Sequence, residues 1–353
     1  MSQRNLERVL SIQSHVAYGY VGGKAAVFPL QLLGFDVDVV NTVNFSNHSG
    51  YGRSGGTRSS AADLTGIFDA MEQNGFLKPT RLLTGYIPGA EGLSSVANLS
   101  SKLCERTPDL IYLLDPVIGD AGKLYVAADV IPVYRSMLHR ATIITPNWFE
   151  VEVLTDVKIE DQTSLQKALT ILHTTYSVPN VVISSIPLKP WLLDLLPDII
   201  RPTSTSIPDS PTFLLCIASC KDVHSSTSTL STVYANTVPV IPGYFSGVGD
   251  LFSALVLAHY NPSTPPAARL AHAVSLALTK THAILQRTYE YACTLPEVDR
   301  QPTDEELDAK DPTRRIRRMG GRELRLIQGQ AILRGETTAM GDVRRVLEWE
   351  KFW

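Results

Sequence analysis

The chain contains 353 residues, of which 44% are hydrophobic and 19% are charged, and its 32 Lys and Arg residues against 35 Asp and Glu residues give a net charge of −3. A chain of this length can bury a large core without disulfide support. Its near-neutral charge argues against a general nucleic-acid-binding protein, which needs a concentrated basic surface. The four cysteines are scattered, and no apolar run approaches the length that spans a bilayer. We therefore expect a cytoplasmic protein with reduced thiols and no membrane or nucleic-acid partner.

Short apolar runs alternate with helix-like segments along the chain. Five runs are nearly continuous in hydrophobicity, as expected of strands covered on both faces: 9–13, 37–43, 110–115, 141–145 and 181–185. Before the third run, a stripe of Leu64, Ile67, Phe68 and Met71 predicts an amphipathic helix that stops at Gly75. This alternation predicts one doubly wound α/β fold, with a mostly parallel sheet flanked by helices.

A stretch rich in Pro, Ser and Thr, residues 187–232, interrupts this alternation. It contains 14 Ser or Thr residues among the 32 residues from 201 to 232. Such a composition favours a surface insertion, and only 213–219 within it has the pattern of a strand.

A charged segment, residues 297–322, follows the last strongly helical pattern. Its first 22 residues hold seven acidic and six basic side chains and almost nothing apolar, which predicts a mobile linker. We therefore expect one domain over 1–296, this linker, and a C-terminal segment over 323–353 that can return to the domain as an edge strand at 323–333.

The segment 241–260 carries the most informative motif, Gly-x-Gly-Asp directly before an apolar helix. Glycines allow a close backbone approach, and the unpaired N–H groups of a helix start favour an anion. A carboxylate such as Asp250 suits that place if it removes a proton from an alcohol that attacks a bound phosphoryl group. The alternative is that Asp250 simply caps the helix, and the motif alone does not decide between the two.

Polar residues also follow two of the predicted strands. Asp115 ends one strand, and Thr145, Asn147 and Glu150 follow the next. Ligands in open α/β sheets bind at the carboxyl ends of strands, where carboxylates suit Mg²⁺ that bridges protein acids to phosphates. In the alternative interpretation, Thr145 and Glu150 are ordinary helix caps and Asp115 is one half of an ion pair.

The loops after the first two strands favour a small-molecule site. The first presents Ser14 and His15, and the second, 41–52, mixes polar and aromatic residues in a way that suits a flat heteroaromatic ligand or a turn-rich connection. Gly22-Gly23-Lys24 is not a P-loop, because Tyr18 and Ala25 stand where that motif needs Gly and Ser or Thr. No Gly-x-Gly-x-x-Gly follows a predicted strand, which excludes a dinucleotide-binding dehydrogenase.

Together these segments resemble the pyridoxal kinase family of the ribokinase-like superfamily. Seven motifs stand in that family's order across most of residues 8–296: VLSIQSHVAYGYVG, FPLQLLGF, NFSNHSGYG, LLTGY, DPVIGD, ITPNWFE and GVGD. The resemblance implies a ribokinase-like fold with a small flap over the active site. It implies phosphorylation of the 5′-hydroxymethyl group of pyridoxal, pyridoxine or pyridoxamine in vitamin B6 salvage. It also implies ATP as the donor, Mg²⁺ or Zn²⁺ together with K⁺, and a homodimer.

The same resemblance implies roles for individual residues. Asp250 would be the catalytic base, with the amides around Gly247 and Gly249 as the anion hole for the transferred group. Substrate contacts are implied for Asp250 and for Ser14, Ser49 and Tyr86. Nucleotide contacts are implied for Asp115, Asp120, Tyr125 of the flap, Asn147, Glu150, Ser185, Val248 and Gly249. Asp115 and Glu150 would approach Mg²⁺ through water, and Thr145 and Ser184 would lie near a monovalent cation.

One residue departs from the family motif, because Val248 stands where Gly-Thr-Gly-Asp has Thr. Valine keeps the β-branched shape but loses a hydroxyl, which is worth about 0.5–1.5 kcal/mol in a neutral hydrogen bond. We therefore expect an active kinase that is slower or binds the nucleotide more weakly. Two alternatives stay open at this point: a kinase for another hydroxymethyl heterocycle such as hydroxymethylpyrimidine, and a degenerate protein that binds B6 compounds without catalysis.

Overall fold

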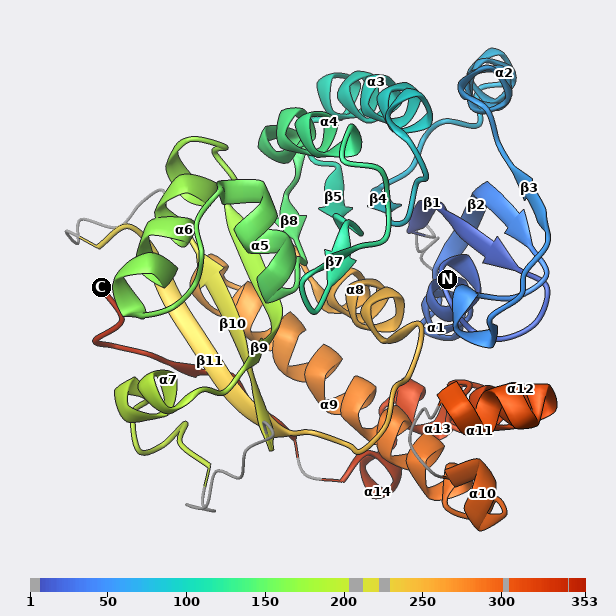
Figure 1. Cartoon of the computed structure of the whole chain (residues 1–353). Helices are drawn as coiled ribbons and strands as arrows, with labels where there is room; N and C mark the ends of the chain where they lie inside the picture. Colours follow the sequence, from blue (N-terminus) through green and yellow to red (C-terminus); the bar gives the residue numbers. More distant parts are fainter. Residues whose placement is uncertain (1–6, 203–211, 222–228, 301–304, 342) are drawn as a thin grey trace.

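The computed structural model describes residues 7–202, 212–221, 229–300, 305–341 and 343–353. A ten-stranded sheet in the order β12-β11-β10-β9-β8-β5-β4-β1-β2-β3 forms its centre (Figure 1). The strands from β9 to β2 are parallel, whereas β10, β11, β12 and β3 pair antiparallel with their neighbours. The strands are β1 (Arg8–Val16), β2 (Asp36–Phe45), β3 (Gly56–Arg58), β4 (Arg81–Thr84), β5 (Ile111–Leu114), β8 (Ile143–Ile144), β9 (Asn180–Pro187), β10 (Phe213–Cys220), β11 (Thr232–Pro239) and β12 (Leu347–Glu348). A separate hairpin pairs β6 (Gly119–Asp120) with β7 (Lys123–Leu124).

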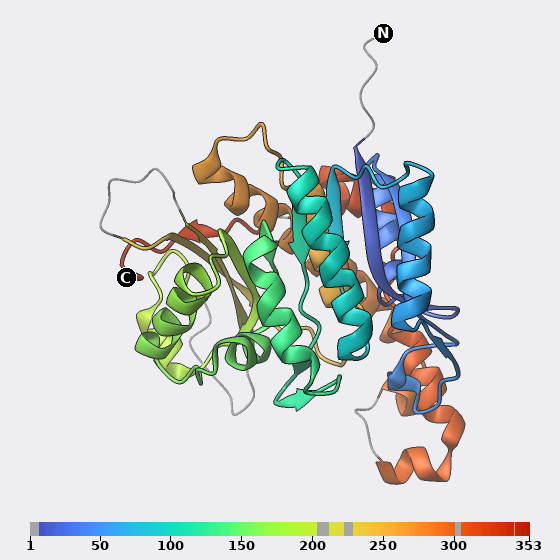
Figure 2. The same ribbon diagram turned by 90° about the horizontal axis from the view of Figure 1, so that it is seen from above.

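Helices cover both faces of the sheet (Figure 2). One apolar cluster joins the sheet to α2–α7 and the other joins it to α1, α8, α9 and α13. The helices are α1 (Gly23–Leu32), α2 (Ala61–Gln73), α3 (Ala90–Arg106), α4 (Val130–Met137), α5 (Trp148–Thr155), α6 (Gln162–Thr174), α7 (Pro190–Leu195), α8 (Val248–His259), α9 (Pro266–Ala292), α10 (Glu297–Arg300), α11 (Glu305–Lys310), α12 (Pro312–Gly321), α13 (Gln330–Arg334) and α14 (Thr337–Met340). Two 3-10 turns, η1 (Ser49–Tyr51) and η2 (Leu138–Arg140), complete the elements.

The predicted fold class is confirmed. All five predicted strands are present as β1, β2, β5, β8 and β9, and the strand expected within the Ser/Thr-rich stretch is β10. Residues 203–211 and 222–228 of that expected insertion lie outside the described residues. Its first part instead contains α7, and Leu192, Leu196 and Ile200 there are buried in the core. Strands β4 and β11 were not predicted, because they lie in segments with few consecutive apolar residues. No helix within the described ranges is long and apolar enough to cross a membrane.

The helix predicted before Gly75 is α2. Ser60 caps its start in a reciprocal pair with Asp63, and Gly75 follows its end with a left-handed φ of 71°. Leu64 and Phe68 are buried as predicted, but Ile67 is 42% exposed. The buried stripe is therefore narrower than the periodicity suggested.

The charged segment after α9 contains helices where composition predicted a linker. Arg314 and Arg318 of α12 are each 1% exposed and both donate to Asp308 of α11, at 2.6 Å and 2.9–3.0 Å. Arg317 binds Asp299 of α10 at 2.9 Å. Composition could not reveal this arrangement, because it counts charges without showing that they pair with each other.

The edge strand expected at 323–333 was wrong in position. Leu324 and Leu326 alternate with polar residues as in a strand, but both are buried in the cluster around α1 and α9, and α13 begins at Gln330. The edge strand is instead β12, which lies nearer the C-terminus and pairs with β11. Beyond it, the Phe352 carbonyl accepts a 3.0 Å bond from Gln162 of α6.

Replacing the shared carboxylate tests whether the charged helices are held by their ion pairs. We expect Asp308→Ala to lower the free energy of unfolding by about 3 kcal/mol, because two buried guanidinium groups lose the carboxylate that they share. The control is Asp156→Ala, which removes a pair to Arg135 in which the carboxylate is 77% exposed, and this change should stay within about 1 kcal/mol. Denaturant unfolding measures both, and equal effects would contradict the paired arrangement.

Candidate active site

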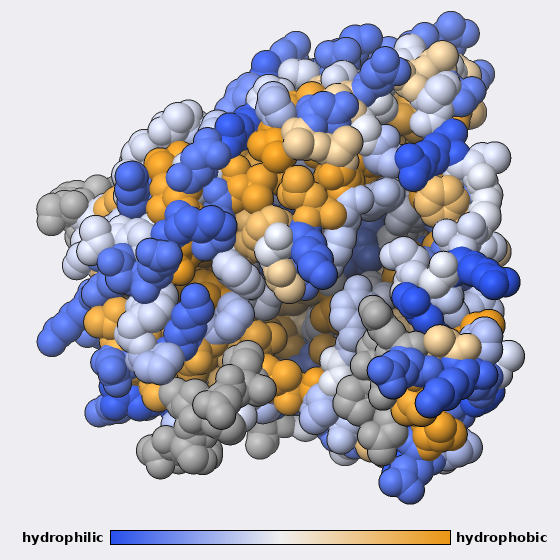
Figure 3. All heavy atoms as spheres, viewed as in Figure 1, coloured by the Kyte–Doolittle hydropathy of each residue, from blue (hydrophilic) through white to orange (hydrophobic). Residues whose placement is uncertain are grey.

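The predicted site residues gather at the edge of the sheet where the parallel strands end. The loops after β1, β2, β5 and β8 all leave the sheet at this edge, and α8 begins there after β11. Figure 3 shows this side of the molecule hollowed near the position that β7 and α8 occupy in Figure 1. The topology thus brings together segments that are far apart in the sequence.

Asp250 is the third residue of α8, and it does not cap the helix. Gly247 occupies the capping position without a side-chain bond. The Asp250 Oδ2 atom instead accepts a 2.8 Å bond from the backbone N–H of Gly22, which precedes α1. Burial raises the pKa of Asp250, and the Gly22 amide partly opposes that shift. The capping interpretation of Asp250 is therefore wrong, and its carboxylate is held between the starts of two helices.

The two glycines before Asp250 have different surroundings: Gly247 is closely packed, whereas Gly249 borders an open space. Gly247 has a φ of 80°, and a Cβ atom there would lie 2.0 Å from the Tyr20 carbonyl oxygen. A Cβ atom at Gly249 would have no heavy atom within 4 Å beyond its own turn of the chain. The first N–H groups of a helix lack intrahelical partners, so this turn offers free amides beside an open space.

A chain of hydrogen bonds links Asp115, Ser253 and Thr145. Ser253 Oγ donates to Asp115 Oδ2 at 3.0 Å and lies 2.8 Å from Thr145 Oγ1. Burial and the nearby Asp250 charge raise the pKa of Asp115 to about 7, although the two hydroxyls oppose the shift. Ser253 was not among the predicted residues, but it lies three residues after Asp250 and therefore on the same side of α8.

Glu150 and Asn147 form a reciprocal capping box at the start of α5. Asn147 Oδ1 accepts from the Glu150 N–H at 2.9 Å, and Glu150 Oε2 accepts from the Asn147 N–H at 2.9 Å. Glu150 Oε1 also accepts from the Ile118 N–H at 2.9 Å, and Asn147 donates to the Gly119 carbonyl at 2.8 Å. The capping alternative is thus correct for Glu150 but not for Thr145, whose hydroxyl bonds to Ser253. The Asn147–Glu150 pair in addition anchors the β6–β7 hairpin. Burial and the Asp115 charge raise the pKa of Glu150.

The β6–β7 hairpin carries Asp120 and leads into Tyr125. The Tyr125 N–H binds the Ile118 carbonyl at 2.8 Å, and its side chain is 52% exposed. Burial of the hydroxyl and the neighbouring Tyr244 raise the pKa of Tyr125. Asp120 Oδ1 accepts from the Ala121 N–H at 2.8 Å. The predicted flap segment is therefore a hairpin anchored at the edge that holds Asp115.

Besides Asp250, the residues implied for substrate contact lie on three different segments. Ser14 is 8% exposed, and its Oγ lies where a side chain on Gly22 would be, 2.1 Å from that Cβ position. Ser49 is exposed at the start of η1, and Tyr86 is half-buried after β4. Burial raises the pKa of Tyr86. Only Ser14 is brought directly to the Gly22–Asp250 contact.

Ser184 and Ser185 lie on β9, next to the end of β8. The Ser184 N–H donates to the Pro146 carbonyl at 3.0 Å, which places it one residue from Thr145. Both serines are partly exposed. In the described part of the chain, no group of three or more His, Cys, Asp or Glu side chains is arranged to hold a metal ion.

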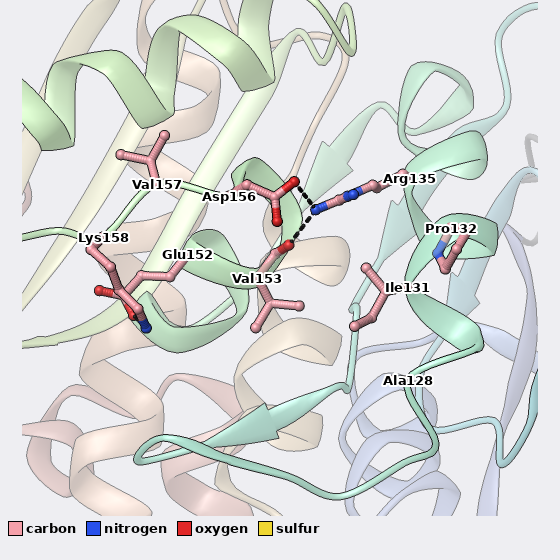
Figure 4. A pocket seen from close by; sticks show the side chains of 9 residues that line it. All are labelled: Ala128, Ile131, Pro132, Arg135, Glu152, Val153, Asp156, Val157 and Lys158. Carbon is pink, nitrogen blue, oxygen red and sulfur yellow. Dashed lines mark hydrogen bonds and ion pairs between the residues drawn. The ribbon is translucent and has the colours of Figure 1, made fainter.

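A separate pocket of about 520 Å³ lies between α4 and α5 (Figure 4). None of the predicted site residues lines it. Arg135 binds Asp156 at 2.6 Å and the Val153 carbonyl at 2.8 Å, and Lys158 binds Glu152 at 2.7 Å. Since its charged groups are paired with each other, we do not assign this pocket to the site.

Known proteins resemble the chain over most of its length. A family model described as phosphomethylpyrimidine kinase matches residues 81–202. The pyridoxal kinase of Arabidopsis thaliana is 36% identical over 329 residues, covering 93% of this chain and 91% of that protein. The Homo sapiens pyridoxal kinase is 34% identical over 294 residues, covering 81% and 86%. The solved structure of Leishmania donovani pyridoxal kinase with ADP and pyridoxamine has a TM-score of 0.76 and 32% identity, covering 97% of this chain and 99% of that one.

The fold and the strand-end site define a ribokinase-like kinase. The chain belongs to the pyridoxal kinase family, because full-length relatives of that name exceed 30% identity over more than four-fifths of it. The Leishmania donovani pyridoxal kinase has also been solved with ADP and pyridoxine. The resemblance stated from the seven motifs is confirmed.

The raised pKa of Asp115 predicts a pH-dependent stability. Its folded pKa of about 7 exceeds the ordinary value of 3.8, so the folded protein retains a proton that the unfolded chain releases. Wild-type stability should therefore fall as the pH rises from about 4 to about 7. Asp115→Asn removes this penalty, and we expect it to stabilise the ligand-free protein at pH 8 by on the order of 2 kcal/mol. Thermal unfolding from pH 4 to 8 measures the difference in stability between the variant and wild type. A variant less stable than wild type at pH 8 would contradict the raised pKa of Asp115.

Proposed function

We propose that this chain transfers the γ-phosphoryl group of ATP to the 5′-hydroxymethyl group of pyridoxal, and also of pyridoxine and pyridoxamine, with Asp250 as the general base. The observation that supports this best is the position of Asp250. Its carboxylate has a pKa raised by burial and lies in the first turn of α8, beside the free amides of the glycine turn. A base and an anion-binding turn therefore share one helix start.

The proposed reaction is a single displacement. The 5′-hydroxyl gives its proton to Asp250 as its oxygen attacks the γ-phosphorus, and the bond from that phosphorus to the bridging oxygen breaks to release ADP. A raised pKa suits a base that works near neutral pH, because it increases the drive to accept the proton. The Gly22 amide holds the carboxylate in one orientation, so little reorganisation accompanies the transfer.

The glycine turn would stabilise the charge on the transferred group. The amides of Gly247, Val248 and Gly249 stand at the N-terminal end of α8, where the helix dipole also favours negative charge. The space beside Gly249 would admit the phosphoryl oxygens. On the substrate side, Ser14 would hydrogen-bond the pyridine ring, with Ser49 and Tyr86 flanking it.

The donor set fits a divalent cation held mainly through water. Asp115 and Glu150 are buried acids at this edge in addition to Asp250, and Glu150 already accepts bonds from backbone amides through both oxygens. Two carboxylates without a third protein ligand match Mg²⁺, which keeps several waters and contacts substrate phosphates. When bound, this cation, or Zn²⁺ in its place, would neutralise charge on the ATP phosphates.

The remaining proposals concern the nucleotide, a monovalent cation and assembly. Thr145 follows β8, and Ser184 lies within β9, where its N–H donates to the carbonyl of the neighbouring Pro146. The backbone and hydroxyl oxygens of these two residues would suit K⁺. Nucleotide contacts are proposed for the surrounding residues of the same edge: Asp120, Tyr125, Asn147, Ser185 and Val248. We also propose a cytoplasmic homodimer, by analogy with the family.

Removing the base tests the proposed mechanism directly. We expect Asp250→Asn to lower kcat for pyridoxal by about 10²–10⁴-fold, because the carboxamide cannot accept the proton. ATP binding should change little. A coupled assay of ADP release, with pyridoxal and hydroxymethylpyrimidine as competing alcohols and with or without K⁺, measures this. Asp250→Asn with near wild-type turnover would exclude Asp250 as the base, and a preference for hydroxymethylpyrimidine would favour the alternative substrate.

Restoring the family hydroxyl tests the cost of Val248. Val248→Thr keeps the β-branched shape and adds one hydrogen-bonding group at the start of α8. We expect kcat to rise or KM for ATP to fall by about 2–10-fold, which corresponds to one neutral hydrogen bond. Val248→Ala is the control, since it changes the packing without adding a hydroxyl. If Val248→Thr changes neither constant, the missing hydroxyl has no functional consequence.

A further inference from the structure

We propose that Glu323, in the segment after α12, is a positioning residue for the substrate side of the site; this inference rests on the proposed function above. Glu323 is 7% exposed and lies about 300 residues along the chain from the first loops of the site. Its carboxylate nevertheless receives three hydrogen bonds from those loops. It thereby joins the loop after β1 to the loop after β2.

The first bond fixes the middle of the loop between β1 and α1. The Tyr20 N–H donates to Glu323 Oε2 at 2.7 Å, and the Gly22 N–H two residues later donates to Asp250. Gly19 shows how closely the carboxylate approaches, since a Cβ atom there would lie 2.5 Å from Glu323 Oε1, and its φ is 91°. The loop that orients Asp250 is therefore itself held by Glu323.

The other two bonds fix the loop that carries Ser49. Tyr51 Oη donates to Glu323 Oε1 at 2.7 Å, and His48 Nε2 lies 3.0 Å from the same atom. The Gly50 N–H donates to His48 Nδ1 at 3.1 Å, so the other ring nitrogen carries the proton and donates to Glu323. Glu323 thus selects both the ring orientation and the tautomer of the residue next to Ser49.

His48 also connects this cluster to the glycine turn before α8. The Ser246 Oγ lies 3.4 Å from His48 Nδ1, directly before Gly247. Helix α12 packs against η1 (Figure 1), and its Arg315 donates to the Gly50 carbonyl at 2.7 Å. The C-terminal segment therefore reaches the loop after β1, the loop after β2 and the glycine turn through Glu323 or its immediate partners.

The electrostatics of Glu323 favour an ionised carboxylate. Burial alone would raise its pKa, but the bonds from His48, Tyr51 and the Tyr20 amide together hold the pKa below its usual value. Each donor therefore bonds to a charged acceptor, which is stronger than a neutral hydrogen bond. All three donors belong to the loops after β1 and β2, away from the nucleotide-side residues on β6 and β9, so the largest effect should fall on binding of the vitamer.

The test compares Glu323→Gln with Glu152→Gln in the wild-type background. A glutamine replaces one of the two acceptor oxygens with an NH₂ group, which cannot accept from the donors that converge there, so at least one bond is lost. We expect Glu323→Gln to raise KM for pyridoxal and the dissociation constant of pyridoxal by about 10-fold, with KM for ATP within about 2-fold of wild type. Glu152 is a similarly buried carboxylate that binds the Ile159 N–H and Lys158 away from the site, and its variant should change neither KM. Tyr51→Phe, which removes one donor and keeps the ring, should raise KM for pyridoxal by about 2–3-fold.

Several outcomes would overturn this role. Unchanged pyridoxal binding in Glu323→Gln, or equal increases in both KM values, would show a merely structural carboxylate. Wild-type protein assayed alongside separates the proposed function from the proposed role of Glu323. Absence of wild-type turnover would contradict the proposed function. The equilibrium binding of pyridoxal, measured by calorimetry, would still test the role of Glu323. If Glu323→Gln fails to fold, Tyr51→Phe decides, and its unchanged pyridoxal binding would exclude the proposal.

Discussion

The hydrogen bond from the Gly22 amide to the Asp250 carboxylate is the contact on which the site depends. Gly22 caps α1 and Asp250 lies in the first turn of α8, so the bond joins the starts of two helices in the same layer. No side chain can stand at Gly22, because its Cβ would lie 2.1 Å from Ser14 Oγ. Likewise, Gly247 leaves no room for a Cβ against the Tyr20 carbonyl. The glycines thus bring an acid, an anion-binding turn and a candidate substrate contact together.

The same edge concentrates negative charge that the fold does not neutralise. Burial raises the pKa values of Asp115, Glu150 and Asp250. In addition, the charge of Asp250 raises the pKa of Asp115, and the charge of Asp115 raises the pKa of Glu150. Such an arrangement reduces stability in the absence of ligand, as is common at functional sites. This arrangement would suit the proposed kinase, because a cation bound with the nucleotide would find carboxylates already in place.

The fold class and much of the site were predictable from sequence for identifiable reasons. Strands buried on both faces leave continuous apolar runs, which located β1, β2, β5, β8 and β9. Parallel strands must end at one edge, which explains why Asp115, Thr145 and Asn147 could be grouped from their positions in the chain alone. The pattern around Asp250 pointed to the α8 turn but left capping open, and only the Gly22 contact resolved it.

What the sequence could not predict depends on long-range pairing. No motif around Glu323 marks it as a site residue, and its partners His48 and Tyr51 are more than 270 residues away. Arg314 and Arg318 were counted as part of a linker because composition does not show which charges meet. For the same reason Leu324 and Leu326 looked like a strand, although the packing of α1 and α9 buries them in a loop.

A crystal structure with pyridoxal and a non-hydrolysable ATP analogue tests the role of Asp250 most directly. We predict that its carboxylate lies within hydrogen-bonding distance, about 2.6–3.2 Å, of the 5′-oxygen, and that the amides of Gly247–Gly249 face the γ-phosphate. A structure in which Asp250 points to bulk solvent, away from the 5′-oxygen, would contradict that role.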